Sequence, residues 1–166
     1  VTVINSTVYG NDASEGGGIA NASQATLVFR NSIVVGNTSP NGADVNTTNA
    51  TLTSNGANIF GSVVGASLPA GDQVGISAAS VINTTLADNG GPTRTHALVN
   101  NSSAINRGIN AHSVDNLGAT LTTDQRGFPR PSGGTVDIGA FEHSSAPPTL
   151  DAIGNLTINE DAAQQT

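Results

Sequence analysis

The chain has 166 residues, a formal net charge of −7, no cysteine, and only 10% charged and 3% aromatic residues. Its acidic balance disfavours nucleic acid and anionic membranes as partners, and the lack of cysteine excludes thiol catalysis, Cys-ligated zinc and disulfides. Its many Asn, Thr, Ser and Gly residues favour short strands and tight corners over helices. No apolar run approaches the roughly 20 residues that span a bilayer.

A repeat organises the first part of the chain. Residues 5–11, Asn-Ser-Thr-Val-Tyr-Gly-Asn, return 26 positions later as Asn-Ser-Ile-Val-Val-Gly-Asn, with five of seven identical, and Ala-Thr-Leu at 25–27 recurs at 50–52. A fixed period of this length is typical of a solenoid, in which equivalent residues of successive coils lie above one another at about 4.8 Å. The sequence therefore predicts an all-β fold, a right-handed parallel β-helix with about three coils.

The orientation of the side chains depends on a corner in each coil. Val3 and the equivalent Phe29 are expected on the inner face. Strict alternation beyond them would turn Val8 and Val34 outward, whereas a bend at Asn5 and Asn31 would turn them inward. We favour the bend, because Asn tolerates the left-handed backbone conformation that a corner needs.

Further equivalences follow from the repeat. Val45 takes the place of Ile19. In the third coil, Ile59-Phe60 is aligned with Val34-Val35, 25 residues earlier. Asn11 and Asn37 are predicted to form a side-chain amide ladder. The glycine-rich stretch at 15–18 is interpreted as a turn, since a phosphate-binding loop needs a following helix and usually a Lys.

From about residue 66 the period fades, and residues 83–142 are expected to cover the strand edge that the last coil leaves open. Four separated motifs occur here in order: Leu-Ala-Asp-Asn-Gly-Gly-Pro-Thr-Arg-Thr-His-Ala-Leu at 86–98, Ser-Ala-Ile-Asn-Arg-Gly at 103–108, Thr-Asp-Gln-Arg-Gly-Phe-Pro-Arg-Pro at 123–131 and Asp-Ile-Gly-Ala-Phe-Glu at 137–142. Together they resemble the choice-of-anchor Q domain, which ends right-handed parallel β-helix proteins on bacterial surfaces. Where the family tends to have Pro and Asp, this chain has Ala104 and Asn106.

The same resemblance implies an extracellular or cell-surface location. The coils resemble, more loosely, the repeats of polymorphic outer-membrane proteins and autotransporter passengers. The predicted domains are β-helix coils at 1–65, last coils and closing segment at 66–142, a Pro-rich linker at 143–149, and at 150–166 a stretch similar to the start of an Ig-like or cadherin-like repeat. The strand-like opening without a start Met or signal peptide favours an excerpt of a longer protein.

Proteins of the β-helix class include polysaccharide lyases and hydrolases, so catalytic carboxylates must be considered. In the 26-residue register Asp12 aligns with Thr38 and Asp44 with Gly18, so these acids and Glu15 form no stripe on one face. Arg30 is the one basic residue of the coils. We therefore predict no catalytic residue in this chain. An enzyme is the less favoured interpretation, and the question stays open.

The charged residues of the closing motifs are open to two interpretations, a site or a structural role. We favour the structural role, with Asp124 and Arg126 as a local ion pair and Asp88-Asn89-Gly90-Gly91 as a plain turn. The acids and cations concerned are Asp88, Asp124, Arg126, Asp137 and Glu142.

No cofactor is predicted. A structural Ca²⁺ held by Asp88 with Asn89, or by Glu160 with Asp161, stays open, because oxygen-rich loops suit that ion. The histidines are too scattered for a zinc site and are interpreted as exposed or capping residues; they are His96, His112 and His143.

Two functions remain as hypotheses. The first is a non-catalytic structural or adhesive segment of a secreted or cell-surface bacterial protein, monomeric within a longer chain, whose rigid polar surface contacts extracellular glycans or surface proteins. The second is the scaffold portion of a polysaccharide lyase or hydrolase whose active site lies in missing N-terminal coils. Neither involves nucleic acid or membrane insertion by this fragment.

Overall fold

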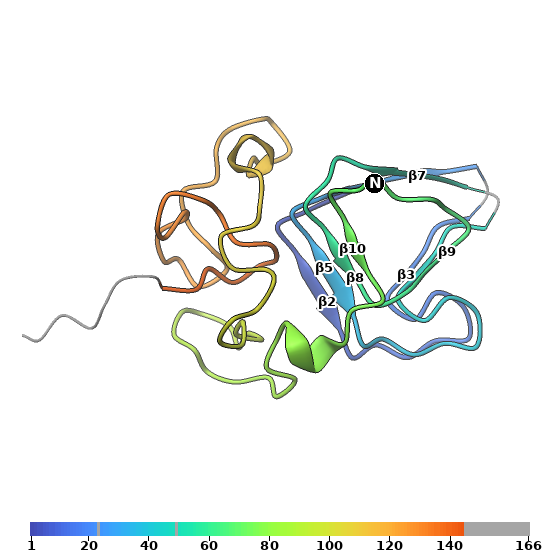
Figure 1. Ribbon diagram of the computed structural model, residues 1–166, viewed down its shortest axis with the longest axis horizontal. Coiled ribbons are helices and arrows are strands. Elements are labelled where there is room, and N and C mark those ends of the chain that lie inside the picture. The colour runs from blue at the N-terminus through green and yellow to red at the C-terminus, as the bar shows by residue number, and fades with distance from the viewer. Residues whose placement is uncertain (23, 49, 145–166) are drawn as a thin grey trace, which may run out of the picture.

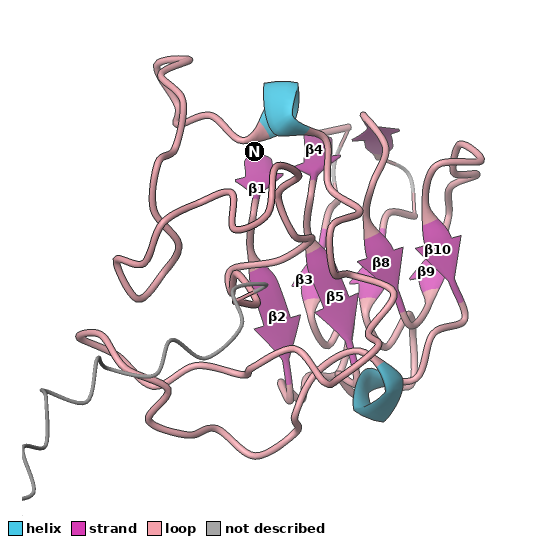
Figure 2. Cartoon of the chain, turned by 60° about the vertical axis from the view of Figure 1, so that its left-hand side comes forward, coloured by secondary structure: helices cyan, strands magenta, loops and turns pink. Residues whose placement is uncertain are grey.

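The computed structural model describes residues 1–22, 24–48 and 50–144, and this part of the chain is all-β (Figures 1 and 2). Its helices are the short 3-10 segments η1 (Ala78–Ser80) and η2 (Asn110–His112). The strands are β1 (Thr2–Ile4), β2 (Thr7–Tyr9), β3 (Ile19–Ala20), β4 (Thr26–Arg30), β5 (Ile33–Val35), β6 (Val45–Asn46), β7 (Thr51–Ser54), β8 (Ile59–Phe60), β9 (Val63–Val64) and β10 (Gln73–Val74).

The strands form three parallel sheets with the orders β1-β4-β7, β10-β8-β5-β2 and β3-β6-β9. From β1 to β9 the chain passes through each sheet once before it returns to the first, and β10 then adds a strand to the second sheet. Figure 1 shows the sheets as three walls around a common interior. We call one such circuit a coil. The predicted columns are confirmed, since Val3 pairs with Phe29 and Val8 with Val34. Ile19 likewise pairs with Val45.

The corner between the first two walls is a left-handed bend, as predicted. Asn5 and Asn31 have φ angles of 41° and 46°. The bend reverses the alternation, so that Val34 lies in the interior beside Phe29 while its neighbour Ile33 faces outward from β5. The expected inner face is thus confirmed.

The predicted alignment of the third coil is wrong by one residue. Ile59 pairs with Ile33 and Phe60 pairs with Val34, a spacing of 26 rather than 25. The preceding wall keeps the spacing of 25, because Leu27 pairs with Leu52. The extra residue is absorbed in the turn before β8, where Ala57 has a φ of 55°. A local insertion in a turn shifts every later residue without disturbing the strands on either side.

The interior of the coils holds the aromatic core. The rings of Phe29 and Phe60 lie edge to face with centroids 5.1 Å apart, and neither side chain is exposed. Residues from all three sheets complete this cluster, which comprises Leu27, Phe29, Val34, Val45 and Phe60 with the partly buried Val3, Val8, Ile19, Leu52, Val63 and Leu68 around it. Each buried side chain of this size stabilises the fold by about 1.5–3 kcal/mol.

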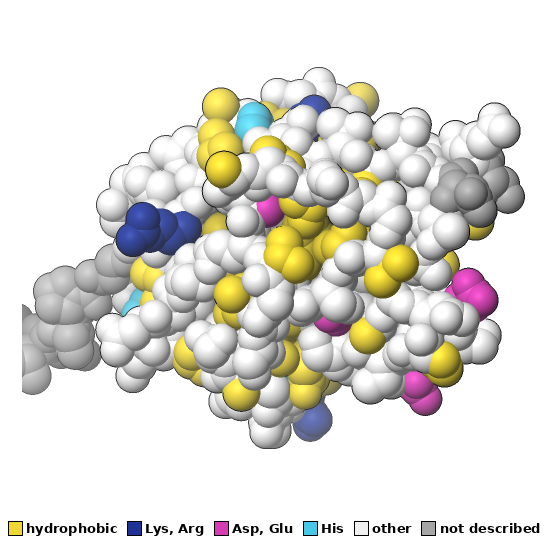
Figure 3. All heavy atoms as spheres, turned by 45° about the vertical axis from the view of Figure 1, so that its right-hand side comes forward, with side chains coloured by type: hydrophobic (Ala, Val, Ile, Leu, Met, Phe, Trp, Pro, Cys, Tyr) yellow, Lys and Arg dark blue, Asp and Glu magenta, His cyan; other side chains and the backbone are white. Residues whose placement is uncertain are grey.

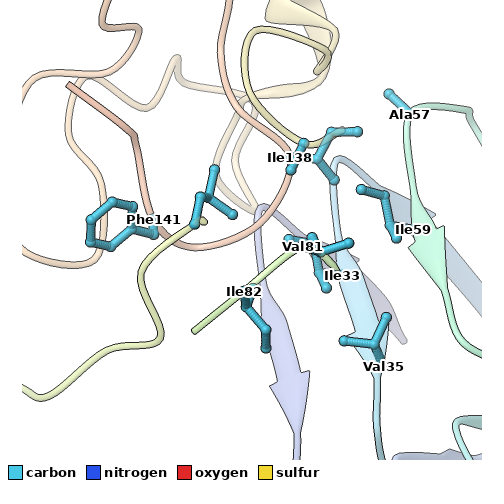
Figure 4. Packing of buried hydrophobic residues seen from close by; sticks show 10 residues of the cluster. Ile33, Val35, Ala57, Ile59, Val81, Ile82, Ile138 and Phe141 are labelled. Atoms are coloured by element: carbon cyan, nitrogen blue, oxygen red, sulfur yellow. The ribbon is translucent and has the colours of Figure 1, made fainter. Parts of the chain in front are cut away.

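The closing segment is irregular, as expected, but its position differs from the prediction. It packs laterally on the outer face of the β2-β5-β8-β10 wall, where Ile33, Val35 and Ile59 point out of the coils (Figure 4). Among the described strands none pairs with the free edge of β10. The apolar outer face explains the difference, because burying it removes more apolar surface from water than covering one strand edge would. The residues that cover it include Val81, Ile82, Leu98, Ala104, Ile138 and Phe141.

The corner asparagines also attach the closing segment. The Asn31 side chain accepts a hydrogen bond from the Ile109 backbone N–H at 2.8 Å and donates one to the Ile109 carbonyl at 3.0 Å. One coil earlier, Asn5 Nδ2 donates to Ser113 Oγ at 2.8 Å. The same residue type therefore sets the bend and connects the coils to the segment beside them.

These two roles of Asn31 are separable by mutation. Asn31→Gly keeps the positive φ without strain but removes both hydrogen bonds, and it should lower the free energy of unfolding by about 1–3 kcal/mol. Asn31→Ala should lose a further ~1–2 kcal/mol, because alanine is strained in the left-handed region. Urea denaturation measures both. Asn101→Gly, at an exposed residue with a φ of 63°, is the matched control. Equal stability of Asn31→Gly and wild type would contradict the attachment role.

Candidate functional site

The predicted amide ladder exists, and it ends on an acid. Asn11 Nδ2 donates to Asn37 Oδ1 at 2.9 Å, and Asn37 Nδ2 donates to Asp44 Oδ1 at 2.9 Å. Asn37 and Asp44 are both buried. The third position of the column is taken by Asp44 of the second coil, because the third coil lacks the corresponding loop: Val45 pairs with Val63, only 18 residues later. These hydrogen bonds therefore stabilise the stack of coils, and they occupy the Asp44 carboxylate.

Two other acids of the coils are aligned with neutral residues of the next coil, as the repeat predicts for Asp12. Asp12 pairs with Thr38, whose hydroxyl donates to the carboxylate at 2.6 Å, and Glu15 pairs with Asn41. Arg30 lies on β4 beside Ile4 of β1. The Asp12 and Glu15 carboxylates thus each accept a hydrogen bond from a neutral side chain of the next coil.

A buried ionic network fills the closing segment. The predicted pair is confirmed, with Arg126 Nη2 at 2.7 Å from Asp124 Oδ2. The same carboxylate accepts the backbone N–H of Glu142 at 3.0 Å, and Arg126 donates to the Glu142 carbonyl at 2.6 Å. The guanidinium lies 3.6 Å from the centre of the Phe141 ring, where the face of the ring attracts a cation.

Sequence reasoning missed a second pair, Arg130 with Glu142. Arg130 Nε lies 3.0 Å from Glu142 Oε2, and both side chains are almost completely buried. The Glu142 carboxylate also accepts the backbone N–H groups of Ser132 at 2.9 Å and Asp137 at 3.2 Å. The only signal in the sequence was the presence of opposite charges in two neighbouring motifs, which does not specify partners.

The third acid of the network joins another motif. Asp137 Oδ1 accepts the backbone N–H of Asn106 at 2.7 Å, and Asp137 Oδ2 accepts that of His143 at 2.5 Å. The three carboxylates thus tie together the motifs at 103–108, 123–131 and 137–142. Their lone pairs are occupied by the protein's own donors, which favours the structural interpretation over a site.

Burial and hydrogen bonding move the pKa values of these acids in opposite directions. Burial acts to raise the pKa of Asp124, but hydrogen bonds from the Glu142 backbone and from Arg126 lower it overall. For Asp137 and Glu142 burial prevails over the hydrogen bonds they accept, and the pKa of each is raised.

These shifts predict greatest stability in mildly acidic solution. Above pH of about 4, native Asp137 and Glu142 retain protons that the unfolded chain releases, so the free energy of unfolding falls as pH rises through their raised pKa values. Below that pH the unfolded chain takes up protons before native Asp124 does, so stability falls as pH drops through its lowered pKa. Thermal melts at constant ionic strength test this. Asp137→Asn should reduce the fall in stability between mildly acidic and neutral pH. Stability that rises steadily up to neutral pH would contradict the assignment.

Among the described residues, the remaining sequence candidates bring no metal site together. Asp88 accepts the Gly90 N–H at 3.0 Å in the predicted turn, and Asn89 donates to Thr95. Within residues 1–22, 24–48 and 50–144, no three His, Asp or Glu side chains group closely enough to hold a metal ion. Glu160 and Asp161 lie outside the described residues, as do most of the predicted linker and the stretch at 150–166.

The histidines are half-buried rather than exposed. His96 meets the ring of Tyr9 edge to face at 4.8 Å, and its Nδ1 lies 2.8 Å from the Asn83 carbonyl oxygen. Because a carbonyl only accepts, Nδ1 carries the proton and Nε2 of the neutral ring is an acceptor. His112 lies in η2 and His143 beside Asp137.

The structure adds a pocket that no sequence motif indicated. We call it the Tyr9–His96 pocket; its volume is about 300 Å³, and it lies between β2 and the closing segment. It is built from four separate stretches of chain, which explains why the sequence did not reveal it. Its lining residues are Thr7, Val8, Tyr9, Asn11, Leu86, Arg94, Thr95, His96, Gln125, Ala140 and Phe141.

Comparison with protein-family models, with curated proteins and with solved structures finds no match to this chain. The resemblance of the closing motifs to the choice-of-anchor Q domain therefore rests on the motifs themselves. Neither helical segment of the described residues has the length or apolar character to cross a bilayer.

Proposed function

We propose that this chain is a non-catalytic segment of a right-handed parallel β-helix protein, secreted or held on a bacterial surface, whose rigid polar surface contacts extracellular glycans or proteins. The right-handed path is the expected one, because about 98% of connections between parallel strands of one sheet are right-handed. The closing motifs, which resemble a module that ends such proteins, support the surface location.

The observation that carries the proposal is the register of the three sheets. Thr26 and Thr51 are both exposed and pair on adjacent parallel strands, so on this wall a hydroxyl group repeats at strand spacing. Figure 3 shows one face, on which charged side chains are few and most of the visible surface is uncharged polar side chain or backbone. Hydroxyl and amide groups in a fixed array match the hydroxyls of a glycan by hydrogen bonding.

Binding to immobilised glycans tests this function. The purified protein should retain a defined set of extracellular bacterial or host glycans and release no reducing ends from them. Depolymerisation of a bound polysaccharide would contradict the non-catalytic role and favour the lyase or hydrolase scaffold. Retention of no glycan on the array would remove glycan contact from the proposal.

Location is tested in the organism that produces the protein. Protease added to intact cells should digest the protein, or the protein should be recovered from the medium, while a cytoplasmic marker stays intact. Protection until the cells are lysed would contradict a secreted or surface location.

A further inference from the structure

The Tyr9–His96 pocket combines an apolar wall with an unpaired cation. The apolar side of the pocket is formed by the edge-to-face rings of Tyr9 and His96. Phe141 and the 49% exposed Leu86 lie beside them. Small-molecule sites are mostly apolar with a few polar groups that fix orientation, and about 300 Å³ lies at the lower end of their usual volumes.

Arg94 supplies the cation. Within the described residues it has no ion pair, whereas Arg126 and Arg130 are held by Asp124 and Glu142. Arg94 is exposed, and no acidic residue lines the pocket. A guanidinium presents paired N–H donors that match the two oxygens of a carboxylate.

Neutral hydrogen-bonding groups surround this cation. The Tyr9 hydroxyl has no hydrogen-bond partner among the described residues, and His96 offers Nε2 as an acceptor. Asn11 uses its amide nitrogen in the ladder and keeps its oxygen for a ligand, while Gln125 Nε2 donates to Thr93 at 3.1 Å. A ligand that suits this set has a carboxylate, several hydroxyls and an apolar ring face.

We propose that the Tyr9–His96 pocket binds a sugar that carries a carboxylate, a uronic acid residue, with Arg94 pairing with the carboxylate and Tyr9 and His96 contacting the ring. This assignment rests on the proposed glycan contact and names its ligand class. The net charge of −7 repels densely charged polyanions, so the ligand is a short or sparsely charged acidic saccharide.

The test uses a matched pair of disaccharides, cellobiouronic acid and cellobiose, which differ by a carboxylate in place of a hydroxymethyl group. Isothermal titration at fixed ionic strength should give wild type an affinity for the acid at least about tenfold higher than for cellobiose, as expected for a charge-assisted hydrogen bond. Arg94→Gln should abolish that difference. Arg107→Gln removes an exposed arginine outside the pocket and should preserve it.

Two further variants separate the roles of the pocket. Tyr9→Phe keeps the ring and removes the hydroxyl, so it should weaken both sugars by a few fold. Arg94→Lys keeps the charge without the paired donors and should bind the acid between wild type and Arg94→Gln. Unchanged thermal melting temperatures establish that each variant is folded.

The outcomes distinguish the pocket assignment from the proposed glycan contact on which it rests. Equal binding of the acid by wild type and Arg94→Gln, or glycan retention on the array with no preference for the acid, would overturn the pocket assignment and leave glycan contact standing. Retention of no glycan at all would overturn both. Preference for the acid that is lost only in the Arg94 variants supports both.

Discussion

Phe60→Ala is expected to lower the free energy of unfolding by about 3–5 kcal/mol. Phe60 lies in the interior of the coils and is fully buried, with its ring 5.1 Å from that of Phe29. Removing the ring takes away its transfer free energy and leaves a cavity that strands fixed on three sides cannot fill. Such a loss is a large part of the ~5–15 kcal/mol that stabilises a typical domain.

Denaturation in urea, followed by circular dichroism, measures this loss as a lower midpoint at unchanged slope. Leu117→Ala is the control: Leu117 is 87% exposed, and its truncation should change stability by no more than about 0.5 kcal/mol. If Phe60→Ala cost as little as Leu117→Ala, the interior packing of the coils would be refuted, and the stacked register with it.

Glu142→Gln is expected to cost about 3–5 kcal/mol, because an amide NH2 group in place of Oε2 cannot accept from Arg130 Nε and the Asp137 N–H and leaves the buried guanidinium without its acceptor. Arg130 and Glu142 are both almost fully buried, so water cannot replace the lost partner. The carboxylate also accepts the backbone N–H groups of Ser132 and Asp137, which the amide can satisfy only in part. The closing segment should therefore be the part of the protein that loosens.

A double variant separates the cost of leaving one buried charge without a partner from the net contribution of the ion pair. Arg130→Met with Glu142→Leu removes both charges and should recover much of the stability lost in Glu142→Gln, because two apolar residues of similar size replace a desolvated pair. Glu15→Gln, at an exposed acid of the coils, is the control for a change of one charge. The same urea experiment applies. A double variant less stable than Glu142→Gln would contradict the buried-pair interpretation.

The coils could be predicted because their information is local and repeated. A period of 26 residues placed Val8 on Val34, and Asn at the corner indicated the bend that turns both inward. The alignment of Ile59 failed for a physical reason. The one-residue insertion lies in a turn of positive φ, and no side-chain pattern records which of two adjacent residues pairs with Ile33.

The candidate site was less predictable, because it depends on distant partners. Asp124 and Arg126 are two positions apart, so their pairing follows from proximity along the chain. Arg130 and Glu142 are separated by a loop, and the Tyr9–His96 pocket joins β2 to residues more than 70 positions away. Composition and spacing carry no record of such contacts.

The sequence by itself determined the all-β class, the coil period, the inward columns and the local ion pair, since each depends on neighbours along the chain or on a strict repeat. The tertiary structure decided that the closing segment lies beside the coils and that Arg94 faces a pocket against Tyr9. Ile33, Val35 and Ile59 give the reason, because they face outward from the wall and their apolar surface is buried only by packing against a segment without a period of its own.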